Sequence, residues 1–145
     1  MESPARILII DDDPDSCELI QLMLQYSNAG YEIISVLTPE EGLRLAAARP
    51  FDLYLLDCRF VGIDGVEVCR RLRQTDAKTP IMFFTGEAQE RVRQEALLAG
   101  ANAYLVKPDD LQKLTGTAKR LLEVHQRADR RNMATNDFNE SAVSA

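Results

Sequence analysis

The sequence predicts an α/β fold in which five parallel strands alternate with five helices. Short apolar runs that resemble buried strands alternate with segments whose apolar residues recur at helical spacing. The connections are of ordinary length, and no internal repeat is visible. Because 145 residues suffice for one complete core, we expect a single domain.

The predicted strands are short and mostly apolar, as expected for strands that are covered on both faces. They cover residues 6–10, 32–37, 51–56, 80–84 and 103–106. The first, third, fourth and fifth are each followed by a polar or charged residue.

Helix-start signals lie between these strands. Asp13 is a candidate N-cap followed by a proline, and residues 38–41 form a capping box with a proline at the first helical position. A third helix is predicted to begin near Asp64, and a fourth to cover about 88–99. The last should start at Asp109 and carry leucines at helical spacing.

The character of the chain changes near Gln126, where the sequence becomes polar, small and aperiodic. We therefore expect a folded domain over residues 1–125 and a flexible polar tail over residues 126–145. A frayed extension of the last helix is the alternative.

Composition excludes several classes of function. The net charge of −6 argues against direct nucleic-acid binding, which requires a basic face. No apolar run approaches the roughly 20 residues of a membrane span, and the N-terminus does not resemble a signal peptide. We expect a cytoplasmic protein that does not act at a membrane.

The cysteines and the histidine argue against a zinc site. Cys17, Cys58 and Cys69 show no C-x-x-C spacing, and His125 is the single histidine. We expect reduced, structural thiols, although Cys58 stands apart because it is adjacent to Asp57. His125 lies on the apolar stripe of the last helix, where a structural role is expected.

Polar side chains follow four of the strands, and the carboxyl ends of parallel strands gather at one edge of a sheet. Asp11 and Asp12 follow the first strand, Asp57 the third, Thr85 the fourth and Lys107 the fifth. Each alone suits a helix cap, a turn or a solvated surface residue. Their joint occurrence at strand ends indicates a common site.

This residue set suits a divalent cation and a phosphoryl group. Adjacent carboxylates such as Asp11 and Asp12 repel each other unless a hard cation neutralises them, and Mg²⁺ prefers carboxylate, water and phosphate oxygens. Asp57 beside such a metal is placed to act as a nucleophile that forms an acyl phosphate. The Thr85 hydroxyl and the Lys107 ammonium could then hold phosphoryl oxygens.

Over about residues 5–125, the chain resembles the receiver domains of two-component response regulators. The resemblance implies a flavodoxin-like, doubly wound five-stranded parallel sheet in the order 2-1-3-4-5. It is carried by Ile7-Leu8-Ile9-Ile10-Asp11-Asp12, Leu55-Leu56-Asp57, Asp64-Gly65, Phe83-Phe84-Thr85-Gly86 and Gly100-Ala101-Asn102-Ala103-Tyr104-Leu105-Val106-Lys107-Pro108.

The resemblance also implies residue roles. Asp57 would be the phosphoacceptor, and Mg²⁺ would be bound by Asp11, Asp12, Asp57 and the backbone carbonyl of Arg59. Lys107 would pair with the acyl phosphate and Thr85 would move to bond it. Tyr104 would rotate inward, although an aromatic on an edge strand is most often packing. The face of the fourth helix, fifth strand and fifth helix would then change its affinity for a partner.

The sequence departs from the family after the acceptor, where Phe60-Val61 replaces the usual Met-Pro. The missing proline frees the backbone of the loop that supplies the carbonyl ligand, and so the phosphorylation rate is in question. Arg59 and Glu87, each two residues after a site residue, resemble the family's modulators of phosphate lifetime. We predict that they pair across the site and restrict the approach of water.

The expected function is a stand-alone phosphorylation switch, not an enzyme, that acts on a downstream protein partner. Its phosphate would come from a sensor histidine kinase, a histidine phosphotransfer protein or a small phosphodonor. Within signalling, the alternatives are a phosphorelay intermediate, a phosphate sink or a degenerate receiver that needs no phosphate. Phosphorylation-dependent dimerisation through the last two helices is compatible with their stripes, which do not require it.

A haloacid-dehalogenase-type phosphatase is the alternative from another class, with Asp11 of Asp11-x-Asp13 as the nucleophile. Asp15 stands where that superfamily usually has Thr or Val, and no Gly-Asp-x-x-x-Asp follows Lys107. This alternative also leaves Asp57 unexplained.

Overall fold

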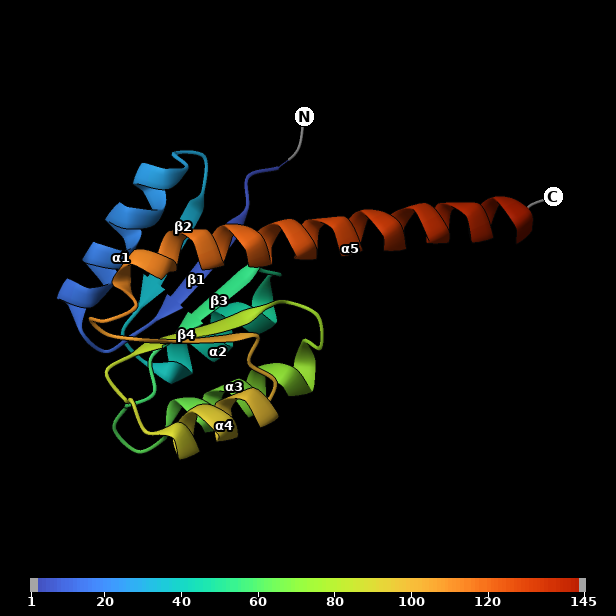
Figure 1. Cartoon of the computed structure of the whole chain (residues 1–145). Helices are drawn as coiled ribbons and strands as arrows, with labels where there is room; N and C mark the ends of the chain where they lie inside the picture. Colours follow the sequence, from blue (N-terminus) through green and yellow to red (C-terminus); the bar gives the residue numbers. More distant parts are fainter. Residues whose placement is uncertain (1–2, 144–145) are drawn as a thin grey trace.

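A parallel five-stranded sheet forms the centre of the molecule in the computed structural model, which describes residues 3–143 (Figure 1). The strand order is β2-β1-β3-β4-β5, and all neighbouring strands are parallel. This is the flavodoxin-like order, so the predicted fold class is confirmed.

The elements follow the predicted alternation along the chain. They are β1 (Arg6–Ile10), α1 (Pro14–Ser27), β2 (Glu32–Val36), α2 (Pro39–Ala48), β3 (Leu53–Leu56), α3 (Gly65–Thr75), β4 (Ile81–Thr85), α4 (Glu90–Leu98), β5 (Ala103–Val106), the 3₁₀ turn η1 (Leu111–Lys113) and α5 (Leu114–Val143).

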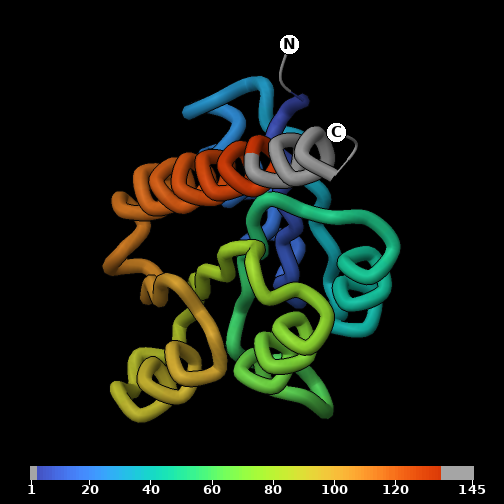
Figure 2. The backbone as a smooth tube through the Cα atoms, turned by 90° about the vertical axis from the view of Figure 1, so that its right-hand side faces the viewer, coloured from blue at the N-terminus to red at the C-terminus, as the bar shows by residue number. Residues whose placement is uncertain are grey.

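Helices cover both faces of the sheet because successive strand side chains point to opposite sides. Ile7 and Ile9 of β1 pack with apolar residues of α1 and α5. Leu8 and Ile10 pack on the opposite side, in the cluster that includes residues of α2, α3 and α4. The sheet is therefore the middle of three layers (Figure 2).

The caps predicted at Asp13 and Thr38 are confirmed, and the third helix begins where predicted, with Asp64 as its N-cap. The side chains of Asp13, Thr38 and Asp64 each accept a hydrogen bond from a backbone N–H in the first turn of the helix that follows. These bonds satisfy donors that a helix start leaves unpaired.

The helix boundaries differ from the predictions in the second half of the chain. The fourth helix begins at Glu90, after the predicted start near Ala88. The last helix does not start at Asp109, because η1 intervenes and α5 begins at Leu114.

Helix α5 then continues to Val143, which agrees with the helical extension that the sequence left open for residues 126–143. In Figure 1 it runs past the body of the domain. Residues 144–145 of the predicted tail lie outside the described residues. The domain boundary at residue 125 stays a prediction.

The thiols of Cys17, Cys58 and Cys69 are buried and free, as predicted. In the described part of the chain, no helix is both long enough and apolar enough to cross a membrane.

Candidate functional site

The carboxyl ends of β1, β3, β4 and β5 bring the predicted site residues together. The strand register is carried past the strand ends by backbone hydrogen bonds: Asp57 N–H donates to the Ile10 carbonyl at 3.0 Å, and Lys107 N–H donates to the Thr85 carbonyl at 2.7 Å. The four loops therefore leave the sheet side by side, which fixes where their side chains can reach.

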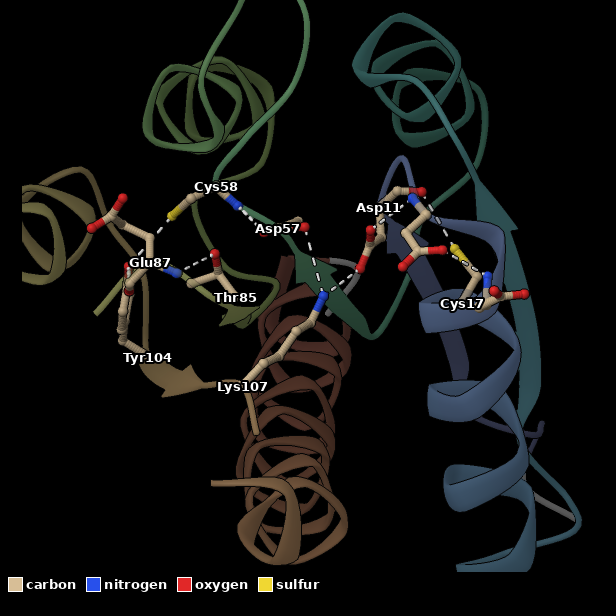
Figure 3. A network of polar contacts seen from close by, with 10 residues as sticks. Asp11, Cys17, Asp57, Cys58, Thr85, Glu87, Tyr104 and Lys107 are labelled. Atoms are coloured by element: carbon tan, nitrogen blue, oxygen red, sulfur yellow. Dashed lines mark hydrogen bonds and ion pairs between the residues drawn. The ribbon is translucent and has the colours of Figure 1, made fainter. Parts of the chain in front are cut away.

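Lys107 lies between two carboxylates of this edge (Figure 3). Its Nζ donates to Asp11 Oδ2 at 2.8 Å and lies 3.6 Å from Asp57 Oδ2. The Asp11 side chain is only 1% exposed, and a buried carboxylate is costly unless it is paired. Its other oxygen accepts from the Asp13 N–H at 3.0 Å. Both oxygens of Asp11 are therefore engaged.

Asp11, Asp12 and Asp57 form a cluster of three carboxylates. One oxygen from each lies within 4.8 Å of the others, and Asp12 is exposed to solvent. The nearby ammonium of Lys107 carries one positive charge and offsets only part of the negative charge of the three carboxylates. An all-oxygen donor set with one solvent-facing member suits a hard cation that keeps bound water, as Mg²⁺ does.

The Asp57 carboxylate is held by its own loop. The Cys58 N–H donates to Asp57 Oδ1 at 2.7 Å, and Gly65 N–H donates to the Cys58 carbonyl at 2.7 Å. A Cβ on Gly65 would lie 2.2 Å from the Asp57 carbonyl oxygen. The close approach explains a glycine at this position, and it ties the start of α3 to the backbone of Asp57.

A buried polar chain runs from Thr85 towards Tyr104. The Glu87 N–H donates to Thr85 Oγ1 at 3.2 Å, and the Tyr104 hydroxyl donates to the Glu87 carbonyl at 2.7 Å. The Tyr104 ring is buried and stacks on Phe83 with centroids 5.5 Å apart. Burial raises the pKa of the Tyr104 hydroxyl, so this group stays a neutral donor.

Cys58 adds one more contact to this series of buried polar groups. Its Sγ lies 3.5 Å from the Tyr104 hydroxyl oxygen. Because the single tyrosine proton is donated to Glu87, the thiol is the donor to Tyr104. Burial raises the pKa of the Cys58 thiol, which disfavours the reactive thiolate. The sequence placed Cys58 beside Asp57 but gave no sign of this contact.

Arg59 and Glu87 meet across the mouth of the site. Arg59 Nη2 lies 2.6 Å from Glu87 Oε2, with the Arg59 side chain 78% exposed and that of Glu87 11% exposed. The hydrogen bond from Arg59 holds the pKa of Glu87 below its usual range. The structure thus brings together two residues that lie on the loops after β3 and β4.

The Phe60-Val61 departure has a clear structural consequence. Phe60 packs against the core cluster beneath α2, α3 and α4, whereas Val61 is fully exposed. A bridge between Arg59 and Asp64 closes the loop. An apolar contact and a backbone bridge therefore restrain a segment that lacks the usual proline. Its effect on phosphorylation rate stays a prediction.

Comparison with known proteins gives consistent matches over this region. A family model described as the response regulator receiver domain matches residues 7–119. The transcriptional regulatory protein YkoG of Bacillus subtilis (strain 168) is 37% identical over 109 residues, which are 75% of this chain and 47% of that protein. The chain spans about half the length of the curated relatives it matches.

Two solved structures extend the likeness to the fold. The CheY-like receiver domain protein from Methanospirillum hungatei JF-1 matches with a TM-score of 0.80 and 28% identity, over 87% of this chain and 99% of that one. The response regulator TrrA from Thermotoga maritima, in complex with Mg²⁺-BeF, matches with a TM-score of 0.72 and 32% identity, over 81% and 98%.

Proposed function

This chain belongs to the response regulator receiver family, and from that premise we propose that it is a phosphorylation switch with Asp57 as the phosphoacceptor. Members of this family act in two-component systems, where phosphorylation and Mg²⁺ are general features. The observation that carries the proposal is the position of Asp57 beside both an acidic cluster and Lys107.

The proposed chemistry is transfer from a phosphohistidine of a sensor histidine kinase or a histidine phosphotransfer protein. A carboxylate oxygen of Asp57 attacks phosphorus, a P–O bond forms and the P–N bond breaks. The imidazole leaves with the electron pair and is protonated. His125 of this chain lies on α5 near Asp52, which precedes β3, whereas Asp57 follows the carboxyl end of that strand. The phosphoryl donor is therefore expected to be another molecule.

The metal would be held by Asp11, Asp12, Asp57 and the backbone carbonyl of Arg59. When bound, Mg²⁺ would offset the negative charge of the carboxylates and of the incoming phosphoryl oxygens. Lys107 already contacts Asp11 and approaches Asp57, so a small shift would let it pair with a phosphoryl oxygen. The Thr85 hydroxyl carries one proton, which it can donate to a second phosphoryl oxygen.

Intact mass after incubation with acetyl phosphate tests this proposal. We expect one added phosphoryl group in the presence of Mg²⁺ and little or none after treatment with EDTA. Equal incorporation with and without EDTA would contradict the role of the metal. No incorporation from either acetyl phosphate or a histidine kinase would favour the phosphate-independent alternative.

Phosphate lifetime should depend on the pair of Arg59 and Glu87. We propose that this ion pair restricts the approach of water to Asp57. Arg59→Ala and Glu87→Ala should then each speed dephosphorylation, by about twofold to fivefold for a contact so exposed. Decay of phosphorylated protein, followed by mass after removal of the donor, measures this rate.

Arg91→Ala is the matched control for this experiment. Arg91 is also an exposed arginine paired with a glutamate, Glu95, but both lie on α4 outside the site. Its dephosphorylation rate should equal that of the wild type. A rate unchanged in both Arg59→Ala and Glu87→Ala would show that the pair does not control access of water.

We propose that the output is a change in the partner affinity of the α4-β5-α5 face. Tyr104 of β5 is bonded to the loop that follows β4, which links the site to this face. Leu98, the last residue of α4, is an exposed apolar side chain. The partner would be a protein, and nucleic-acid binding is not expected of this acidic segment. The same proposal includes a domain of residues 1–125 that acts alone in the cytoplasm and is not an enzyme. It also includes dimerisation that depends on phosphorylation.

Family membership removes the phosphatase alternative. That alternative required Asp11 as the nucleophile, and it leaves the position of Asp57 beside Lys107 and the acidic cluster unexplained. The phosphorelay and phosphate-sink alternatives remain. Rapid transfer of the phosphoryl group from Asp57 back to a histidine protein would favour them, whereas a long-lived phosphate with a changed partner affinity would favour the switch.

A further inference from the structure

A second cluster of ligating side chains lies at the opposite edge of the sheet. It consists of Asp52, just before β3, and of His125 and Asp129, which are four residues apart on α5. One carboxylate oxygen from each aspartate and one imidazole nitrogen lie within 4.8 Å of one another. The proposed phosphorylation chemistry uses none of these residues.

The distances in this cluster suit coordination better than hydrogen bonding. His125 Nε2 lies 3.6 Å from Asp52 Oδ1 and 3.4 Å from Asp129 Oδ2. An N–H···O hydrogen bond is typically about 2.9–3.0 Å long. Two ligands at ~2.0–2.1 Å from a tetrahedral ion are separated by about 3.3 Å, close to both observed distances.

The ligands are partly preorganised. The second oxygen of Asp52 accepts the Arg6 backbone N–H at 2.8 Å, which fixes the carboxylate and leaves Oδ1 facing His125. The imidazole is held in place by burial, with only 8% of its side chain exposed. Outer contacts of this kind orient metal ligands in proteins.

The cluster also has an open side. The Asp129 side chain is 51% exposed, and a surface cavity of about 480 Å³ is lined by all three residues. The same cavity is lined by Asp76 and Lys78. An ion can therefore enter from solvent, and water can complete its coordination.

We propose that Asp52, His125 and Asp129 bind a divalent transition-metal ion of the Zn²⁺ type. The sequence argued against a zinc site because it has one histidine and no C-x-x-C spacing, and only the fold brings the two aspartates to that histidine. An imidazole with two carboxylates favours such an ion over Mg²⁺, whereas the all-oxygen cluster at Asp57 favours Mg²⁺. Since Asp52 immediately precedes β3 and the other two ligands lie on α5, the ion would fix the helix where it leaves the domain. Binding would couple the metal to the orientation of the α5 extension.

Titration of metal-free protein with Zn²⁺, in the presence of excess Mg²⁺, tests the proposal by calorimetry. Co²⁺ absorption adds a readout of tetrahedral, nitrogen-containing coordination. We expect one site, and a loss of affinity of at least about tenfold in His125→Gln and in Asp129→Asn. Because Asp129 is half exposed, the second variant should fold even if replacing the buried histidine disturbs packing.

Asp12→Asn is the matched control, because it removes a carboxylate from the other cluster. It should keep the affinity for Zn²⁺ and the Co²⁺ spectrum of the wild type. Zn²⁺ should also raise the melting temperature of wild type and Asp12→Asn, but not that of Asp129→Asn. Undiminished binding in both His125→Gln and Asp129→Asn, or no binding to the wild type, would overturn the proposal and leave an ion-pair contact only.

Discussion

Asp57→Asn is expected to abolish phosphorylation by acetyl phosphate and by a histidine kinase. The amide lacks the anionic oxygen that attacks phosphorus, and it removes one of the three carboxylates that suit a cation. Aspartate and asparagine side chains have nearly the same shape, and the amide oxygen can still accept the hydrogen bond from the Cys58 N–H. The fold should therefore persist while the chemistry is lost, and intact mass measures the difference.

Asp15→Asn is the control for loss of charge. Asp15 is exposed in the first turn of α1 and is not a member of the acidic cluster. We expect it to incorporate one phosphoryl group like the wild type. Phosphorylation of Asp57→Asn at the wild-type level would show that another residue is the acceptor, and the proposed function would then be wrong.

Gly65→Ala is expected to destabilise the domain by about 3 kcal/mol, at the upper end for overpacked sites. The new Cβ would lie 2.2 Å from the Asp57 carbonyl oxygen and 2.7 Å from the Cys58 Cα. Both neighbours are backbone, so neither can rotate aside. Relief of the clash requires α3 or the acceptor loop to move, and phosphorylation should slow as well. Urea unfolding measures the free energy of unfolding.

Gly116→Ala provides a control of opposite sign. A Cβ there would meet nothing within 4 Å, and the residue is exposed in the first turns of α5. Because alanine has fewer unfolded conformations, the substitution should stabilise by about 0.5–1 kcal/mol. Equal stability of Gly65→Ala and the wild type would show that the acceptor loop adapts more freely than its contacts indicate.

The signals that predicted the fold are local in the chain. Asp13, Thr38 and Asp64 cap helices through bonds to residues two or three positions away, so their role is readable from sequence. The gathering of Asp11, Asp57, Thr85 and Lys107 also needed no distances, because parallel strands place their carboxyl ends at one edge. Their meeting follows from strand order alone.

Helix α5 shows where the sequence argument was incomplete. The predicted tail was inferred from weak apolar periodicity after Gln126, but a helix that is already nucleated gains one hydrogen bond with each added residue. Residues 117–143 contain no glycine or proline to stop it. The sequence pattern predicts a last helix that ends near residue 125 and so places His125 in its last turn; this was wrong, because α5 continues to Val143 and His125 lies within it.

By itself, the sequence determined the alternation of strands and helices, the edge that carries the site and the chemistry of its residues, because these follow from local patterns and one rule of parallel sheets. The strand order came from the resemblance to a family and is seen in the structure. Only the tertiary structure decided which distant side chains touch. The Arg59–Glu87 distance, the closeness of Gly65 to Asp57 and the meeting of Asp52 with His125 and Asp129 all depend on how loops and helices pack. Sequence separation carries no information on contacts of that kind, since they are set by the fit of side chains between layers.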